Sequence, residues 1–118
     1  MITRFIPGPL PGRNEQEAAA RTHYHTAAQL KDLWTSHVAR IFAGSGQRYN
    51  RVKVHFRFLE PNRRRDPDNI IASMKYILDG IVAADIIKND GWTQIAGLSF
   101  EWEVVERDPG VIVTVTEA

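Results

Sequence analysis

Arg51-Val-Lys-Val-His-Phe-Arg-Phe-Leu59 alternates polar and apolar side chains along its whole length. Successive side chains of a β-strand point to opposite faces of the sheet, so this period of two predicts a strand. The apolar face, which belongs in the core, consists of Val52, Val54, Phe56 and Phe58. The opposite face is entirely basic or imidazole and consists of Arg51, Lys53, His55 and Arg57. The stretch therefore predicts a sheet with one buried face and one outward, cationic face.

Two helices are expected, one on each side of this strand in the sequence. From Thr26, an expected N-cap, to Phe42, apolar residues recur at helical spacing, and Gly44 ends the run. The second helix is expected to begin at Asp66-Pro67-Asp68, because proline is tolerated in the first turn, and to continue to about Ala84.

Three further strands complete the expected sheet, at 2–6, 94–106 and 111–116. The segment from Pro7 through Asn14 is expected to form a loop, because its prolines and glycines prevent regular structure. The turn sequence Asp108-Pro-Gly110 separates the last two strands and predicts a hairpin. The expected fold is therefore α/β (α+β), a single domain with a small mixed sheet of about four strands and two helices.

Composition narrows the class of protein. The chain has 118 residues, 43% of them hydrophobic, and no cysteine. That length suits one domain that buries its core without disulfides or a structural metal. The absence of cysteine excludes Cys-X-X-Cys sites and thiol nucleophiles, and no apolar stretch is long enough to cross a membrane, so we expect a cytoplasmic protein. The large aromatic residues expected in the core are Trp34, Phe42, Trp92 and Trp102.

Charge is distributed unevenly along the chain, although the formal net charge is only +1. Residues 48–65 carry seven basic side chains and a single acidic one, Glu60. Residues 66–98 then carry five aspartates and two lysines. A basic block beside an aspartate cluster is what a protein needs to bind a polyanion and place cations against its phosphates. On charge alone, a solvated charged surface is the simpler explanation.

The second expected helix places three charged side chains on one face. At about 100° per residue, Lys75 and Asp79 each fall within about 20° of Asp68, opposite an apolar stripe. Helix capping and an ion pair between Lys75 and Asp79 explain part of this pattern. They do not explain why Asp66 and Asp68 flank one proline, since neighbouring carboxylates repel unless a cation lies between them.

A divalent metal ion would remove this repulsion. Mg²⁺ prefers oxygen ligands and takes only a few from protein, so water and substrate phosphate complete its shell. Asp66 and Asp68 would supply two oxygens, and Asp90, in Asn89-Asp90-Gly91, is the most economical third ligand. An ordinary Asx turn is the alternative explanation of Asp90.

Several motifs along the chain fit one family. They are Phe5-Ile-Pro-Gly8, Pro11-Gly-Arg-Asn14, Arg64-Arg65-Asp66-Pro67-Asp68-Asn69-Ile70, Lys75-Tyr-Ile-Leu-Asp79-Gly80 and Ile86-Ile-Lys-Asn-Asp90-Gly-Trp92. Together they resemble the RusA-type endodeoxyribonucleases, the Holliday junction resolvases of bacteria and their phages. The resemblance implies that Asp66, Asp68 and Asp90 bind Mg²⁺, for which Mn²⁺ can substitute, and are catalytic. It also implies a catalytic lysine, here Lys75; the best-known members carry it one turn after the second aspartate, where this chain has Ala72.

The resemblance further implies what the protein does. It implies an endodeoxyribonuclease of DNA recombination and repair that resolves four-way junctions by paired, symmetric hydrolysis, as a C2 homodimer in a bacterial or phage-infected cell. The side chains expected to contact DNA are Asn14, Lys53, Arg57, Arg63, Arg64 and Arg65. Those expected to support the metal ligands are Asn69 and Asp79. A nuclease for flaps or other branched DNA, and a DNA-binding relative without turnover, are the alternative functions.

Overall fold

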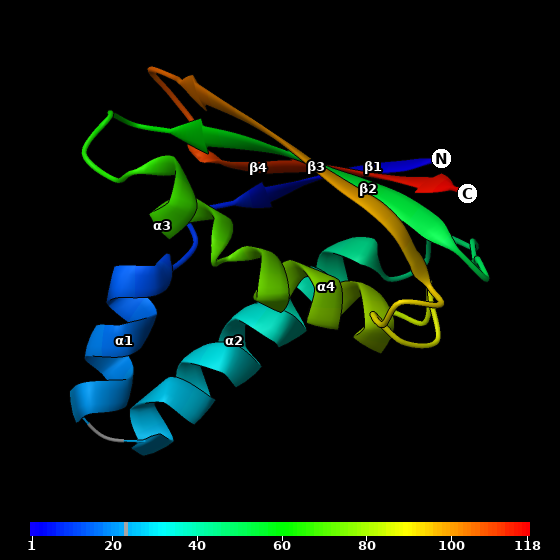
Figure 1. Ribbon diagram of the computed structural model, residues 1–118, viewed down its shortest axis with the longest axis horizontal. Helices are drawn as coiled ribbons and strands as arrows, with labels where there is room; N and C mark the ends of the chain where they lie inside the picture. The colour runs from blue at the N-terminus through cyan, green and yellow to red at the C-terminus, as the bar shows by residue number, and fades with distance from the viewer. Residues whose placement is uncertain (23) are drawn as a thin grey trace.

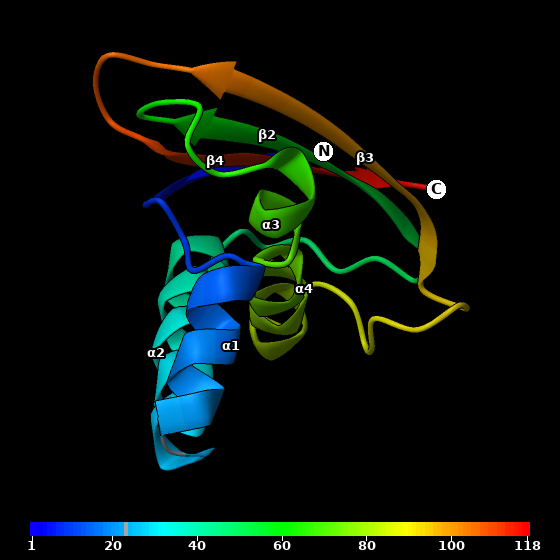
Figure 2. The same cartoon turned by 60° about the vertical axis from the view of Figure 1, so that its left-hand side comes forward.

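The computed structural model describes residues 1–22 and 24–118, and within them four strands form one mixed sheet. The strands are β1 (Ile2–Pro7), β2 (Val52–Glu60), β3 (Ile95–Val104) and β4 (Gly110–Glu117). Their order across the sheet is β1-β4-β2-β3, and the helices lie against one face (Figures 1 and 2). The predicted single α+β domain with a small mixed sheet is confirmed.

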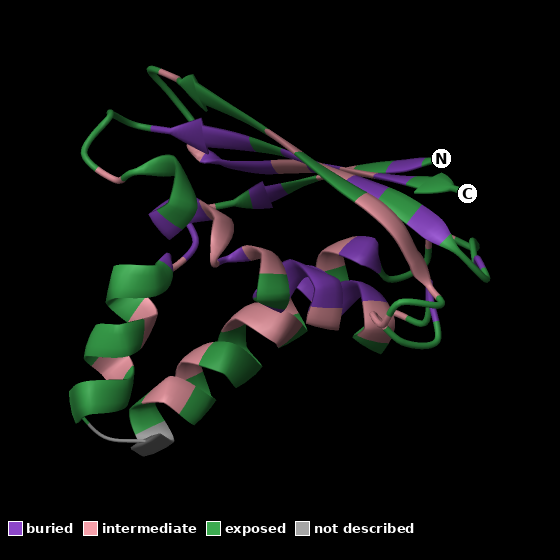
Figure 3. Cartoon of the chain, in the orientation of Figure 1, coloured by how far each residue is buried: buried purple, intermediate pink, exposed green. Residues whose placement is uncertain are grey.

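The strand that the alternating pattern predicts lies inside this sheet. β2 pairs antiparallel with β4 and parallel with β3, so neighbours cover both of its edges. Its apolar face is buried as predicted, with Val52 and Phe56 at 0% exposure. In Figure 3 buried residues lie along the strands of the sheet and along α4 beneath it. Burial of this apolar face against the helices is the main favourable contribution to folding.

The predicted hairpin between the last two strands is wrong. β3 and β4 lie on opposite sides of β2, so the linker between them carries the chain across the end of that strand. Backbone hydrogen bonds hold the two ends apart: Val105 donates to the Glu60 carbonyl at 2.9 Å, and Gly8 donates to the Pro109 carbonyl at 2.9 Å. The turn at Asp108-Pro-Gly110 suits a sharp change of chain direction. The positions of the two strands are decided by pairing, of β3 with β2 and of β4 with β2 and β1.

The helices are more numerous than the two predicted. The described residues contain α1 (Arg13–Thr22), α2 (Tyr24–Phe42), α3 (Pro67–Ile71) and α4 (Met74–Ala83). α1 begins at Arg13, where a loop through Asn14 was expected; it has no buried residue, and its only apolar side chains are three consecutive alanines, which do not mark a helix in the sequence. None of the described helices is both long and apolar enough to cross a bilayer.

The second predicted helix is divided in two at Ala72 and Ser73. Ser73 is 2% exposed, and both its backbone nitrogen and its Oγ donate to the Ile70 carbonyl, at 3.1 and 2.9 Å. A serine hydroxyl that bonds back to the preceding turn competes with helical hydrogen bonds, which explains the break. The face expected to carry three charged residues is therefore split between two short helices.

α2 and α4 approach each other at Gly80. A Cβ atom built on Gly80 would lie 2.4 Å from Cγ1 of Val38, which is itself fully buried on α2. Glycine is thus required for the close contact between these helices, which together cover the centre of the sheet (Figure 1).

Replacing Gly80 by alanine tests this contact. We expect Gly80→Ala to lower the free energy of unfolding by about 1–3 kcal/mol, because the added methyl group overpacks the interface. Gly97→Ala in β3 is the matched control, since its Cβ would meet nothing closer than Cγ of Lys53, at 3.7 Å. Urea denaturation of both variants gives the comparison, and equal stabilities would contradict the predicted clash.

Candidate functional site

Asp66 and Asp68 lie at the start of α3, one on each side of Pro67. Pro67 occupies the first turn, and Asp66 precedes it in an extended conformation (φ −72°, ψ 151°) without a side-chain capping hydrogen bond. Both carboxylates are exposed, and neither has an ion-pair partner in the part of the chain that the structure describes. Capping by Asp66 therefore does not explain the pair, and both carboxylates are free to bind a cation.

Lys75, Asp79 and Asp90 form a second charged group. Lys75 Nζ lies 2.8 Å from Asp90 Oδ2 and 2.9 Å from Asp79 Oδ1. Hydrogen bonds to Asp90 and then Asp79 raise the pKa of Lys75 above its usual value, so it is an ammonium ion at neutral pH. The expected ion pair between Lys75 and Asp79 on α4 is thus present. Lys75 also binds Asp90 in the loop that precedes β3.

Asp79 is as enclosed as Asp90, the two side chains being 20% and 19% exposed. The Oδ2 atom of Asp79 is buried and has no hydrogen-bond partner among the described residues, and Lys31 Nζ, on α2, lies 3.8 Å from it. Asp79 touches Lys75 and not Asp66 or Asp68, so its contacts make it an anchor for the lysine.

The three predicted metal ligands are not brought together. Among the side chains that the structure describes, no group of three or more Asp, Glu or His residues lies close enough to hold one metal ion. Asp66 and Asp68 fit a site in which two protein carboxylates bind Mg²⁺ and water completes the shell. Asp90 is bound to Lys75, so its role as a third ligand stays a prediction.

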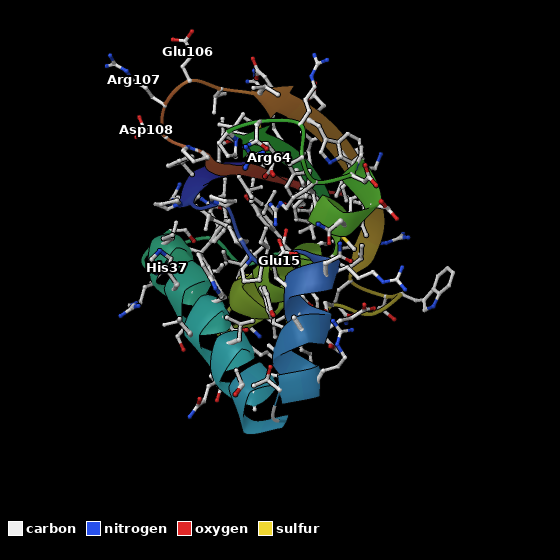
Figure 4. All side chains as sticks on the ribbon, turned by 90° about the vertical axis from the view of Figure 1, so that its left-hand side faces the viewer. Glu15, His37, Arg64, Glu106, Arg107 and Asp108 are labelled. Atoms are coloured by element: carbon white, nitrogen blue, oxygen red, sulfur yellow. The ribbon has the colours of Figure 1, made fainter. Side chains whose placement is uncertain are left out.

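Arg65, predicted to contact DNA, instead binds other parts of the protein. Its guanidinium donates to both oxygens of Glu60, at 3.0 and 2.9 Å, to Glu15 at 2.8 Å and to the Leu10 carbonyl at 2.9 Å. Partial burial acts to lower the pKa of Arg65, but its hydrogen bonds to Glu60 and Glu15 outweigh burial and raise that pKa. Partial burial acts to raise the pKa of Glu15, but the hydrogen bond from Arg65 keeps it below its usual value. Figure 4 shows Glu15 at the beginning of α1.

Asn69 and Asn14 also join segments of the protein. The side chain of Asn69, predicted to support the metal ligands, is buried and accepts a hydrogen bond from the Asn14 backbone at 2.7 Å. This contact fixes the start of α1 against α3. The Asn14 side chain is exposed, so its predicted DNA contact remains untested.

Arg63 and Arg64 remain as exposed cations beside the two carboxylates. Neither makes an ion pair with a described residue, and Arg63 lines the same surface hollow as Asp66, Pro67 and Trp102. Arg64 lies in the loop after β2, where its backbone nitrogen donates to Asn62 Oδ1 (Figure 4). Two free cations thus lie next to two free carboxylates at the entrance to α3.

Two of the four basic or imidazole side chains expected on the outward face of β2 are paired with acids of β3. Arg57 forms an ion pair with Glu103, and His55 lies 2.6 Å from Glu101 Oε2, both acids belonging to the neighbouring β3. The parallel register places Glu101 opposite Arg57 and Ser99 opposite His55. Arg57 is therefore not a free cation, whereas Lys53 is exposed and keeps its predicted role.

The aromatic residues expected in the core divide into two groups. Phe42 is fully buried and Trp34 packs against the core, whereas Trp102 is 40% exposed and Trp92 is 97% exposed. Trp92 follows directly after the turn residues Asn89-Asp90-Gly91 and belongs to no apolar periodic pattern. That position in the sequence is the signal that Trp92 is not a core residue.

No model of a known protein family matches the chain, and no curated protein matches it significantly. The chemistry of the site is therefore argued from its own side chains.

Replacing Arg65 tests its structural role. We expect Arg65→Ala to lower the free energy of unfolding by about 3 kcal/mol, because the side chain of Glu60, 8% exposed, would lose its partner. Arg64→Ala is the matched control, which should change stability by less than about 0.5 kcal/mol. Thermal and urea denaturation provide the measurement, and an Arg65→Ala variant as stable as the control would disprove the role.

Proposed function

We propose that the protein is a metal-dependent endodeoxyribonuclease that acts on four-way DNA junctions. The observation that carries the proposal is the pair of free carboxylates, Asp66 and Asp68, next to the free cations Arg63 and Arg64. Carboxylates bind the hard cations that phosphate chemistry requires, and arginine binds phosphate in a bidentate manner. This combination on one exposed edge suits a phosphodiester substrate better than a neutral or a cationic one.

Each residue has a part in this chemistry. Asp66 and Asp68 would hold Mg²⁺ or Mn²⁺, which when bound neutralises phosphate charge and lowers the pKa of a bound water. Arg63 and Arg64 bind the DNA backbone, and Lys53 extends the contact along β2. Lys75 is a permanent cation that can stabilise the negative charge that develops on the phosphate. Asp79 holds Lys75 in place, and Asp90 is the proposed third ligand.

Two further parts of the proposal depend on the resemblance to RusA-type enzymes. The resemblance favours four-way junctions over other DNA, and paired, symmetric cleavage requires two sites related by a two-fold axis, hence a C2 homodimer. It also favours action in the cytoplasm of a bacterium or a phage-infected cell.

A binding protein without turnover is the second candidate function. One observation favours it: the described part of the chain does not gather Asp66, Asp68 and Asp90 around a common point. Such a protein would use Arg63, Arg64 and Lys53 to bind branched DNA and would have no need of the carboxylates.

Replacing Asp68 separates the two candidates. We expect Asp68→Asn to reduce Mg²⁺-dependent cleavage of a mobile four-way junction roughly 100-fold or more while the variant still shifts the junction on a gel. Asp85→Asn, at an exposed aspartate paired with Arg48, is the matched control and should cleave normally. Reactions run with Mg²⁺, Mn²⁺ and EDTA provide the measurement.

The products show which substrate is preferred. Paired nicks in strands of like polarity on a fixed junction support resolution, and single nicks near the branch indicate a flap nuclease. Wild-type binding with no cleavage under any of these conditions would leave the binding protein as the function.

Salt dependence tests the role of the arginines. The double variant Arg63→Ala/Arg64→Ala should reduce the slope of log K against log salt by about 2, because each phosphate contact contributes about one unit. Arg40→Ala, in the last turn of α2, is the matched control and should leave the slope unchanged. Fluorescence anisotropy with a labelled junction over a salt series gives the slopes, and an unchanged slope in the double variant would remove both arginines from the interface.

A further inference from the structure

Trp92 projects from the surface beside the second charged group. Its 97% exposure exceeds that of any other large apolar residue in the described chain. The turn beneath it is held by two hydrogen bonds, because the backbone nitrogens of Gln94 and Ile95 donate to the Gly91 carbonyl at 3.2 and 3.0 Å. An ordered turn therefore presents an uncovered indole to solvent.

The surroundings of Trp92 connect it to the candidate site. Trp92 shares a shallow surface hollow with Asp90, Gly91, Ile95, Gly97 and Leu98. Asp90 is held by Lys75, and Gly97 pairs in register with Lys53, whose Cγ lies 3.7 Å from the position of a Cβ on Gly97. Trp92 therefore lines a hollow that borders two lysines, Lys75 through its contact with Asp90 and Lys53 through its pairing with Gly97.

We propose that Trp92 stacks on a base that is unpaired or exposed at the branch point of DNA. The indole supplies a flat π surface on which any base can stack, and Lys53 and Lys75 supply cations for the adjacent phosphates. Within a continuous duplex every base is covered on both faces by its neighbours, whereas at a branch point the arms can unstack and leave base faces open.

This inference rests on the proposed function, because it assumes that branched DNA reaches Asp90 and Lys75. It gives a physical reason why the protein would prefer branched DNA to uniform duplex, because the stacking contact is available only at a branch. The phosphate contacts of Arg63 and Arg64 do not discriminate between the two, since both kinds of DNA have the same backbone. A second copy of the chain packing on Trp92 is the competing occupant.

Comparison of Trp92→Ala with Trp92→Phe tests the inference. We expect Trp92→Ala to bind a four-way junction about tenfold more weakly than wild type and uniform duplex equally well, while Trp92→Phe keeps most of the affinity. Leu33→Ala is the matched control, since Leu33 is an apolar residue 60% exposed on α2. Denaturation should show all three variants to be as stable as wild type, because the side chains of Trp92 and Leu33 are both exposed.

A junction with 2-aminopurine at the branch reports stacking directly. Its fluorescence should be quenched by wild type and by Trp92→Phe but not by Trp92→Ala. Equal junction binding by wild type and Trp92→Ala would overturn the inference. So would a shift from dimer to monomer in Trp92→Ala on sedimentation, with unchanged affinity per dimer, because the ring would then contact a second copy.

The outcomes distinguish this inference from the nuclease proposal. If wild type never cleaves but Trp92→Ala weakens junction binding selectively, the stacking contact stands and the nuclease proposal fails. If wild type cleaves junctions and Trp92→Ala binds and cleaves normally, the stacking contact fails and the nuclease proposal stands. If wild type binds no branched DNA, both fail.

Discussion

The arrangement of the candidate site depends on one ion pair, between Arg65 and Glu60. Glu60 ends β2 and is nearly buried, and Arg65, just before α3, binds both of its oxygens together with Glu15 of α1 and the Leu10 carbonyl. One guanidinium therefore fixes the end of β2, the N-terminal loop, α1 and the start of α3. The exposed carboxylates of Asp66 and Asp68 follow immediately, so their position is set by a contact in which they take no part.

Ion pairs formed on folding also decide which charged side chains stay free. Seven basic residues lie between positions 48 and 65, but several are neutralised once the sheet forms. Arg57 meets Glu103 across a parallel register, and Arg65 is taken up by the fold. Among the described residues, the cations that remain unpaired near α3 are Arg63 and Arg64, and they lie beside the unpaired carboxylates of Asp66 and Asp68. That juxtaposition, rather than the total charge, is the basis of the proposed phosphate chemistry.

The division of the second helix at Ser73 separates two chemical groups. Asp66 and Asp68 lie before the break, whereas Lys75 and Asp79 lie after it and join Asp90. In the proposed nuclease the first group holds the metal ion and the second holds a cation near the phosphate, with Trp92 extending from the same loop as Asp90. In that proposal, metal binding belongs to the start of α3, whereas charge stabilisation and base stacking belong to α4 and the loop before β3.

Local patterns determined much of this protein, because side-chain periodicity and turn chemistry act over a few residues. They predicted β2 and its buried face, the pairing of Lys75 with Asp79, the mixed sheet in a single domain, and the exposed carboxylates that flank Pro67. The tertiary structure alone decided the pairing of β3 with β2 instead of β4, the helix at 13–22, and the binding of Arg65 to Glu15 and to the Leu10 carbonyl. Those features depend on contacts between residues far apart in the chain, and no local pattern specifies which distant partner a strand edge or a charged side chain will meet.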